Sequence, residues 1–198
     1  MTLQLQIQSS ESAIQWLDRN LDGLEIPATD RIRLSAGCLD VALEHQKAIV
    51  LLVANALAGS AAALLRIEFE AYVRGIWLLY SATESELLAF KNDKLKKTFQ
   101  KLLDDLETHD AFTDGVLSKI KSESWGAMNS FTHSGMMQVV RRLNSEEVIP
   151  TYTDAEMIDA LNSANSLGFL AAIAISGMAG NEGLAQRILD RERELFAN

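Results

Sequence analysis

Cysteine and proline are scarce in this sequence, and so are the residues that favour β-strands. The 198 residues include one cysteine and two prolines, and alanine and leucine dominate the 48% hydrophobic content. This composition predicts an all-α protein. The single cysteine, Cys38, excludes an internal disulfide, so we expect a reducing, cytoplasmic location and an inert, buried thiol.

Basic residues are also fewer than acidic ones. There are 18 lysines and arginines against 27 acidic residues, so the formal net charge is -9. Such a protein repels nucleic acids and anionic membranes, and we expect no DNA, RNA or membrane partner. The lysine-rich stretch 91–101 is a local exception, either a solvated helix face or a docking patch. An uncharged run at 48–65 contains Asn55, Gly59 and Ser60, which favour a core hairpin over a membrane span.

The common motifs of metal, phosphate and nucleophile sites are absent. The sequence has no E-x-x-H, H-E-x-x-H or C-x-x-C, so the usual di-iron and zinc patterns are not supported. It also lacks the glycine-rich phosphate-binding motifs and the G-x-S-x-G nucleophile turn. We therefore expect no metal and no cofactor.

Hydrophobic periodicity predicts a single all-helical domain over residues 1–198. We expect a bundle of six or seven helices around a buried central hairpin. The two helices of the hairpin cover about 30–57 and 61–80 and separate at Gly59 and Ser60. Further helices are expected at 10–22, 91–110, 125–143, 154–178 and 184–196, with a short helix and a loop in 111–122.

Short polar residues mark the expected helix starts. A serine, threonine or aspartate side chain there accepts a hydrogen bond from a free backbone N–H, and a glutamate three positions later completes a capping box. The candidates are Ser9 or Ser10, Thr29 or Asp30, Thr83 with Glu86, and Thr153 with Glu156.

Small residues recur at every fourth position of the expected helix 154–178. Such a ridge lets another helix approach closely, and that helix belongs either to the core hairpin or to a second subunit. The residues of the ridge are Ala160, Ala164, Gly168, Ala172 and Ser176.

The expected helix 61–80 is apolar nearly all round, yet it carries Arg66, Glu68, Glu70 and Arg74. Arg66, Glu70 and Arg74 fall at i, i+4 and i+8 and so lie along one side. Buried charge is costly unless it is paired, so one interpretation is a structural ladder in which a carboxylate bridges two guanidiniums. Alternatively, one arginine has spare donors that point into a cavity and hold a carboxylate or phosphate.

A second helical face with polar groups follows in residues 125–143. Trp125, Asn129 and His133 share one side of that helix. We expect this side to face the arginine ladder in a buried polar centre, where Asn129 orients the imidazole. His133 is then either a hydrogen-bonded core residue or a general acid or base.

These two stretches resemble a family of uncharacterised bacterial all-helical proteins. The resemblance rests on R-x-x-x-E-x-x-x-R-x-x-W at Arg66, Glu70, Arg74 and Trp77, and on W-x-x-x-N-x-x-x-H at Trp125, Asn129 and His133. It implies a domain of unknown function without an assigned activity. More distantly, the chain is similar to the HEPN group of helical RNA-cleaving proteins, whose R-x(4-6)-H motif acts without metal. That strict motif is missing here.

The leading hypothesis is a cytoplasmic, non-enzymatic binding or interaction protein that forms a homodimer. Its polar centre is structural or holds a small anionic ligand. The alternative is a metal-independent hydrolase, or a HEPN-like ribonuclease, that uses His133 with Arg66 or Arg74. The candidate binding residues are Arg66, Glu70, Arg74, Trp125, Asn129 and His133, and the catalytic candidates are His133, Arg66, Arg74 and Glu70.

Overall fold

The structure is a computed structural model that describes residues 1–144 and 146–196. Within these ranges it has nine α-helices, one 3₁₀ turn and no β-strand, so the predicted all-α class is confirmed. The expected number of six or seven helices is too low, because the middle of the chain breaks into short helices at Asn92, His109 and Gly135. The elements are α1 (Leu3–Leu21), α2 (Asp30–Ala54), α3 (Ala58–Tyr80), α4 (Glu84–Lys91), α5 (Phe99–Leu106), η1 (Asp110–Phe112), α6 (Val116–Thr132), α7 (Met136–Val140), α8 (Asp154–Met178) and α9 (Glu182–Phe196).

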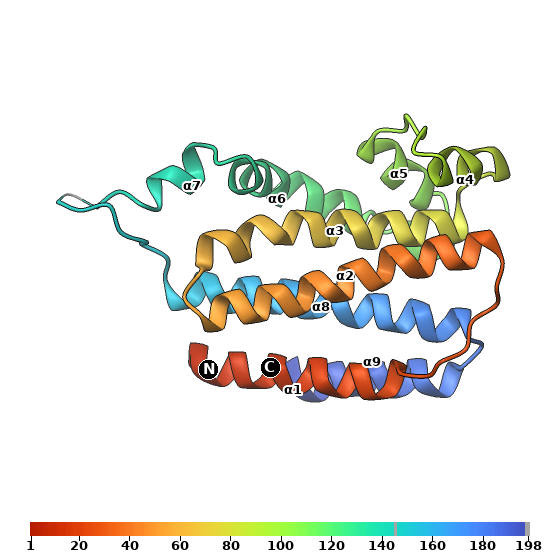
Figure 1. Ribbon diagram of the computed structural model, residues 1–198, viewed down its shortest axis with the longest axis horizontal. Helices are drawn as coiled ribbons and strands as arrows, with labels where there is room; N and C mark the ends of the chain where they lie inside the picture. Colours follow the sequence, from red (N-terminus) through yellow and green to blue (C-terminus); the bar gives the residue numbers. More distant parts are fainter. Residues whose placement is uncertain (145, 197–198) are drawn as a thin grey trace.

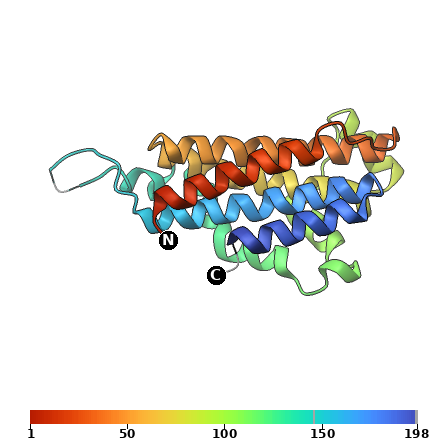
Figure 2. The ribbon, with the colours of Figure 1, turned by 90° about the horizontal axis from the view of Figure 1, so that it is seen from below.

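The helices are arranged in three layers. Figure 1 shows the antiparallel hairpin of α2 and α3 with α8 in the middle layer, and α4 to α7 over α3. The other outer layer is formed by α1 and α9, which lie side by side in Figure 2. Because α3 is covered from both sides, Phe69, Val73 and Trp77 are fully buried. The hairpin is therefore at the centre of the bundle.

The hairpin turns earlier than the sequence predicts. α2 ends at Ala54, and Ala56 adopts a left-handed φ of 57° in the turn. Gly59 and Ser60, the expected break, are already inside α3. A side chain at Gly59 would bring its Cβ within 3.0 Å of Tyr152 Oη. This glycine therefore allows close packing and does not break the helix.

Threonine caps the start of five helices. The side chains of Thr2, Thr29, Thr83, Thr98 and Thr153 each accept a hydrogen bond from a backbone N–H in the first turn. The capping boxes predicted at Thr83 and Thr153 are both present. The expected start of the first helix near Ser10 is wrong, because Thr2 supplies an earlier cap and Ser10 is buried inside α1.

The small-residue ridge of α8 faces the core, where α8 packs against α1, α2, α3 and α9. Among the described residues, α8 is the one helix long and apolar enough to cross a membrane. Half of that apolar stretch is buried against the other helices, as in the central helix of a bundle. All five ridge residues are buried: Ala160, Ala164, Gly168, Ala172 and Ser176.

Buried polar side chains link α1, α2 and α8. Asn165 Nδ2 donates to Ser10 Oγ at 2.8 Å, and Gln46 Nε2 donates to Asn165 Oδ1 at 3.1 Å. Glu68 of α3 is equally buried, but neither of its carboxylate oxygens has a hydrogen-bond partner within the described chain. Gln46 Oε1 also has no partner there. The core thus contains a carboxyl group that no positive charge compensates.

Candidate functional site

Arg66 joins α3 to the end of α6. Its Nε donates to Glu70 Oε1 at 2.8 Å on the next turn of α3. Its Nη1 donates to Asn129 Oδ1 and lies 3.0 Å from His133 Nε2. A guanidinium can only donate, so His133 Nε2 is the acceptor in this contact.

An aromatic stack supports the same arginine. The guanidinium carbon of Arg66 lies 4.6 Å from the centroid of the Trp125 ring. Trp125 stacks on Phe99 of α5 with centroids 4.7 Å apart, and Phe99 meets the buried Phe69 edge-on at 5.6 Å. A cation–π contact at a partly exposed site contributes about 0.5–1 kcal/mol. Arg66 is therefore positioned by an ion pair, two hydrogen-bonding side chains and an aromatic ring.

This cluster lies near the surface, whereas the sequence predicted a buried polar centre. The Arg66 and Glu70 side chains keep 18% and 25% of their surface exposed, and His133 is exposed. The reason is that α6 ends at Thr132, so no further helical turn covers the imidazole. His133 is therefore accessible from solvent, and a catalytic residue must be accessible to its substrate in the same way.

Arg74 is not part of the Arg66 cluster. In the described part of the chain, Glu70 pairs with Arg66, and Arg74 has neither an ion pair nor a hydrogen bond. Arg74 lies two turns beyond Arg66, about 12 Å along the helix axis. The predicted ladder is therefore incomplete. The Glu70 carboxylate pairs with the guanidinium of Arg66, and the guanidinium of Arg74 has no carboxylate partner in the described part of the chain.

Arg74 instead lines a cavity of about 400 Å³ between α2, α3 and α4. Arg33 of α2 is a second arginine in the lining, and neither arginine has an ion-pair partner among residues 1–144 and 146–196. Glu70 is the one carboxylate of this lining, and it is bonded to Arg66. The walls are otherwise largely apolar, formed by Leu34, Val41, Ile67, Ala71 and Phe90.

Cys38 also lines this cavity and is half-buried. Burial raises the pKa of its thiol above the ordinary value, and the nearby Arg74 opposes that shift only in part. The thiol therefore stays protonated at neutral pH and is a poor nucleophile. Cys38 contributes to the wall of the cavity, and its chemistry is that of a small apolar side chain.

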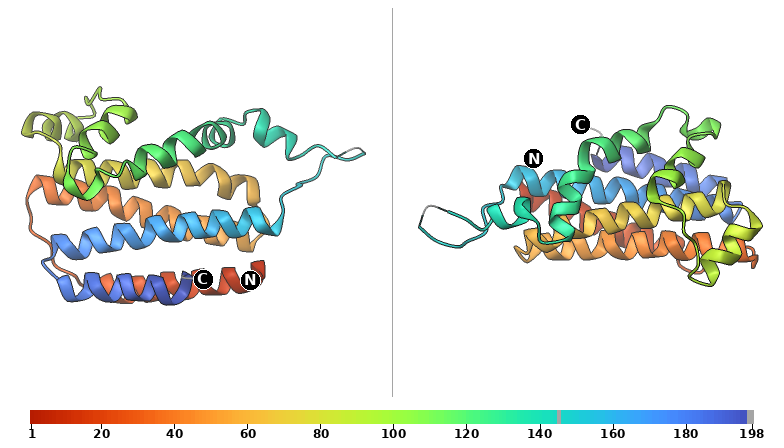
Figure 3. Two further views of the ribbon diagram at one scale, coloured as in Figure 1. Left: turned by 180° about the vertical axis from the view of Figure 1, so that it is seen from behind. Right: turned by 90° about the horizontal axis from the view of Figure 1, so that it is seen from above.

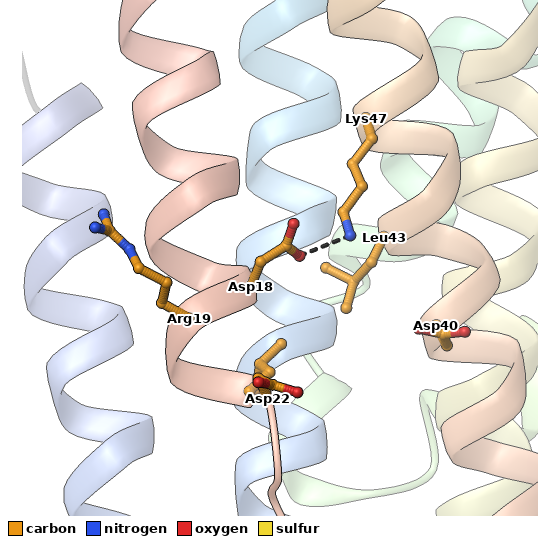
Figure 4. A pocket seen from close by; sticks show the side chains of 7 residues that line it. Asp18, Arg19, Asp22, Asp40, Leu43 and Lys47 are labelled. Carbon is orange, nitrogen blue, oxygen red and sulfur yellow. Dashed lines mark ion pairs between the residues drawn. The ribbon is translucent and has the colours of Figure 1, made fainter.

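A second depression, between α1 and α2, has an acidic character. Figure 4 shows Asp18 and Lys47 pointing toward each other, 2.6 Å apart, while Arg19 points away. Asp22 and Asp40 complete the charged lining. The described residues contain no group of three or more histidine, cysteine, aspartate or glutamate side chains that could hold a metal ion.

Comparison with known proteins gives a family but no activity. The pattern of a family of unknown function, DUF6988, matches residues 39–197. The chain belongs to this family. No curated protein and no solved structure matches it. The part of the chain that matches DUF6988 contains the Arg66 cluster and Arg74 but begins after Arg33.

The sequence predicted most of the residues around Arg66 but did not point to Arg33, the second arginine of the cavity. The spacing of Asn129 and His133 on α6, and of Arg66 on α3, puts them on helix faces that meet in the structure. Arg33 was missed because its place in the same cavity lining as Arg74 depends on how α2 is aligned along α3. No local signal could have found this pair, because each arginine has an acidic residue within one turn of its own helix, Asp30 for Arg33 and Glu70 for Arg74.

Proposed function

We propose that this member of DUF6988 is a non-enzymatic, cytoplasmic binding protein for a small anion with an apolar body, and that the anion is held at Arg74. The observation that carries the proposal is the unpaired guanidinium of Arg74 on the wall of a largely apolar cavity, whose lining also includes Arg33. A guanidinium without a carboxylate partner presents its donors to a ligand. The Arg66 cluster then has a structural role, because Glu70 engages its Nε donor and Asn129 and His133 both engage Nη1.

The lining of the cavity favours a particular ligand class. A cavity of about 400 Å³ is at the small end of the usual range for ligand sites. Apolar walls from three helices suit a hydrocarbon or aromatic body, and the arginines suit a carboxylate head group. The carboxylate of Glu70 lies in the same lining and disfavours groups with more than one negative charge. We therefore expect a monocarboxylate with an apolar body.

Replacing Arg74 with glutamine should remove binding of such a ligand. The probe is octanoate, compared with acetate, which lacks the apolar body, and with octylamine, which has the opposite charge. We expect octanoate alone to raise the midpoint of thermal unfolding and to give a measurable affinity in calorimetry. Loss of a hydrogen bond to a charged group costs about 1.5–3 kcal/mol, so Arg74→Gln should weaken binding by about ten- to a hundredfold.

Arg187→Gln is the matched control, because it makes the same charge change at an exposed position of α9 away from the cavity. It should bind octanoate as the wild type does. Equal affinity of Arg74→Gln and the wild type for octanoate, or no binding of octanoate by the wild type, would contradict the proposal.

A second candidate is a metal-independent hydrolase or HEPN-like ribonuclease centred on His133 and Arg66. The observation in its favour is an exposed imidazole 3.0 Å from a guanidinium, with Asn129 bonded to the same nitrogen of the arginine. Its weakness is that the arginine occupies Nε2, the nitrogen that would accept a proton. The net charge of -9 also disfavours RNA as a partner.

RNA cleavage separates the two candidates. We expect the wild type to release no more product from a labelled single-stranded RNA, in the presence of EDTA, than His133→Ala does. Arg66→Met, which keeps the side-chain stem against Trp125, should behave in the same way. Cleavage that both substitutions abolish while the helical circular dichroism is unchanged would favour the ribonuclease.

A further inference from the structure

We propose that Arg66 is a positioning residue for the anion cavity. It holds the carboxylate of Glu70 away from Arg74 and so keeps the Arg74 guanidinium free for a ligand. This inference rests on the proposed function and adds what maintains the free state of Arg74. Glu70 connects the two places, because it pairs with Arg66 and also lines the cavity.

Glu70 has two candidate partners on its own helix. Arg66 is four residues before it and Arg74 is four residues after it, so both arginines are its neighbours on the surface of α3. Within an isolated helix, the better orientation is an acidic residue four positions before a basic one, and this favours the pair of Glu70 with Arg74. The structure has the other pair, in which Arg66 Nε donates to Glu70 Oε1 at 2.8 Å. Contacts from outside α3 therefore decide which arginine Glu70 binds.

α6 supplies those contacts. Figure 3 shows α6 packed over α3. Arg66 Nη1 donates to Asn129 Oδ1 and lies 3.0 Å from His133 Nε2, and the guanidinium carbon lies 4.6 Å from the centroid of the Trp125 ring. These contacts fix the guanidinium next to Glu70 at no cost to the ion pair itself. The pair therefore loses less side-chain entropy than one made by an arginine that is free to rotate.

A pair between Glu70 and Arg74 would close the anion site. Both side chains line the cavity of about 400 Å³, and Arg74 has no other ion-pair partner in the described part of the chain. The carboxylate of Glu70 is the same chemical group as the head of the expected ligand, so the two compete for the same donors. The apparent affinity for the ligand falls in proportion to the fraction of chains in which Arg74 is free.

A double-mutant cycle measured with octanoate in calorimetry tests this competition. Arg66→Met removes the partner of Glu70 and keeps the side-chain stem against Trp125. We expect it to weaken octanoate binding about two- to fivefold, the size of competition from one ion pair near the surface. In a chain that already carries Glu70→Gln, the same Arg66→Met change should leave the affinity nearly unchanged, because no carboxylate can turn toward Arg74.

The cycle also separates competition from the simple loss of a positive charge. Arg66 is about 12 Å from Arg74 along the helix axis, so its own charge is largely screened there. Lys119→Met is the matched control, because Lys119 is exposed on α6 and forms no ion pair in the described chain, and it should bind octanoate as the wild type does. Equal weakening by Arg66→Met with and without Glu70→Gln would overturn the inference, and so would a wild-type affinity of Arg66→Met.

A crystal structure of Arg66→Met without ligand gives a readout that does not depend on octanoate. The Glu70 carboxylate should lie within about 4 Å of the Arg74 guanidinium, the distance of an ion pair. A carboxylate that stays away from Arg74 would overturn the inference and leave the proposed function standing. A wild type that binds no octanoate would contradict the proposed function, and the crystal structure would still decide whether Arg66 holds Glu70 in place.

Discussion

Glu68→Gln is expected to stabilise the protein at neutral and alkaline pH. Glu68 is fully buried, and both of its carboxylate oxygens lack a hydrogen-bond partner in the described structure. Burial raises the pKa of this carboxyl well above its ordinary value of 4.5. Because no arginine or lysine among the described residues compensates the charge, ionisation in the folded state is strongly disfavoured.

The sign of the pH dependence follows from linkage. The folded state holds the Glu68 proton more tightly than the unfolded chain does, so its contribution to stability is fully present below the unfolded pKa, near 4.5. That contribution is lost as the pH rises from there through the folded pKa. Glutamine does not titrate and has no such loss. The advantage of Glu68→Gln should therefore grow with pH and reach about 1–3 kcal/mol, a cost typical of an uncompensated buried polar group.

Glutamine resembles the neutral form of this side chain. It has nearly the same shape as a protonated glutamate, and its amide can donate a hydrogen bond as the protonated carboxyl can, whereas a carboxylate cannot donate. The substitution therefore keeps an uncharged, donor-bearing side chain at position 68 at every pH.

Denaturant unfolding of the wild type and Glu68→Gln over a range of pH checks this result. Glu44→Gln is the matched control, because Glu44 is exposed on α2 and forms no ion pair in the described chain. It should leave both the stability and its pH slope unchanged. If Glu68→Gln kept the wild-type slope, Glu68 would not be the group that titrates.

Gly168→Ala is expected to destabilise the protein, although alanine is normally the better helix former. A Cβ at position 168 would lie 2.1 Å from Gln46 Oε1 and 2.3 Å from Gln46 Cδ. Gln46 is fully buried and its amide is bonded to Asn165, so it cannot move aside without breaking that bond. Overpacking of this kind costs about 1–3 kcal/mol, more than the gain of about 1 kcal/mol from helix propensity.

The comparison with Gly177→Ala isolates the steric contribution. Gly177 is also in α8, and a Cβ there would meet nothing within 4 Å. Gly177→Ala should raise the midpoint of thermal unfolding, whereas Gly168→Ala should lower it by about 2–4 °C for each kcal/mol lost. Equal gains from both substitutions would show that α8 and α2 are further apart at Gly168 than described.

Local spacing predicted the helical class and several contacts, because these depend on periodicity within one element. The small-residue ridge of α8 could be recognised from the fourfold repeat, and it is buried as the core interpretation required. Arg66, Asn129 and His133 also lie on the helix faces that their spacing indicated. Long helices with strong periodicity carry such information in the sequence itself.

The features that could not be predicted depend on how one helix is aligned against another. Glu70 was equally spaced from Arg66 and Arg74, and only the position of α6 decides that it pairs with Arg66. That Arg33 and Arg74 line the same cavity likewise depends on the register of the hairpin. Ser10 had the residue type of a cap, but Thr2 begins the helix earlier and leaves Ser10 inside it.

The way α6 is attached has a consequence for local unfolding. α6 contacts the bundle mainly through α3, and Leu117 is its one buried residue. Few contacts besides the Arg66 cluster hold its far end, among them the hydrogen bond from Thr132 Oγ1 to Ala63 O at 3.2 Å. An element with so little buried surface opens at a lower free energy than the core. Amide protons of α6 should therefore exchange with solvent as one cooperative unit while those of α3 stay protected.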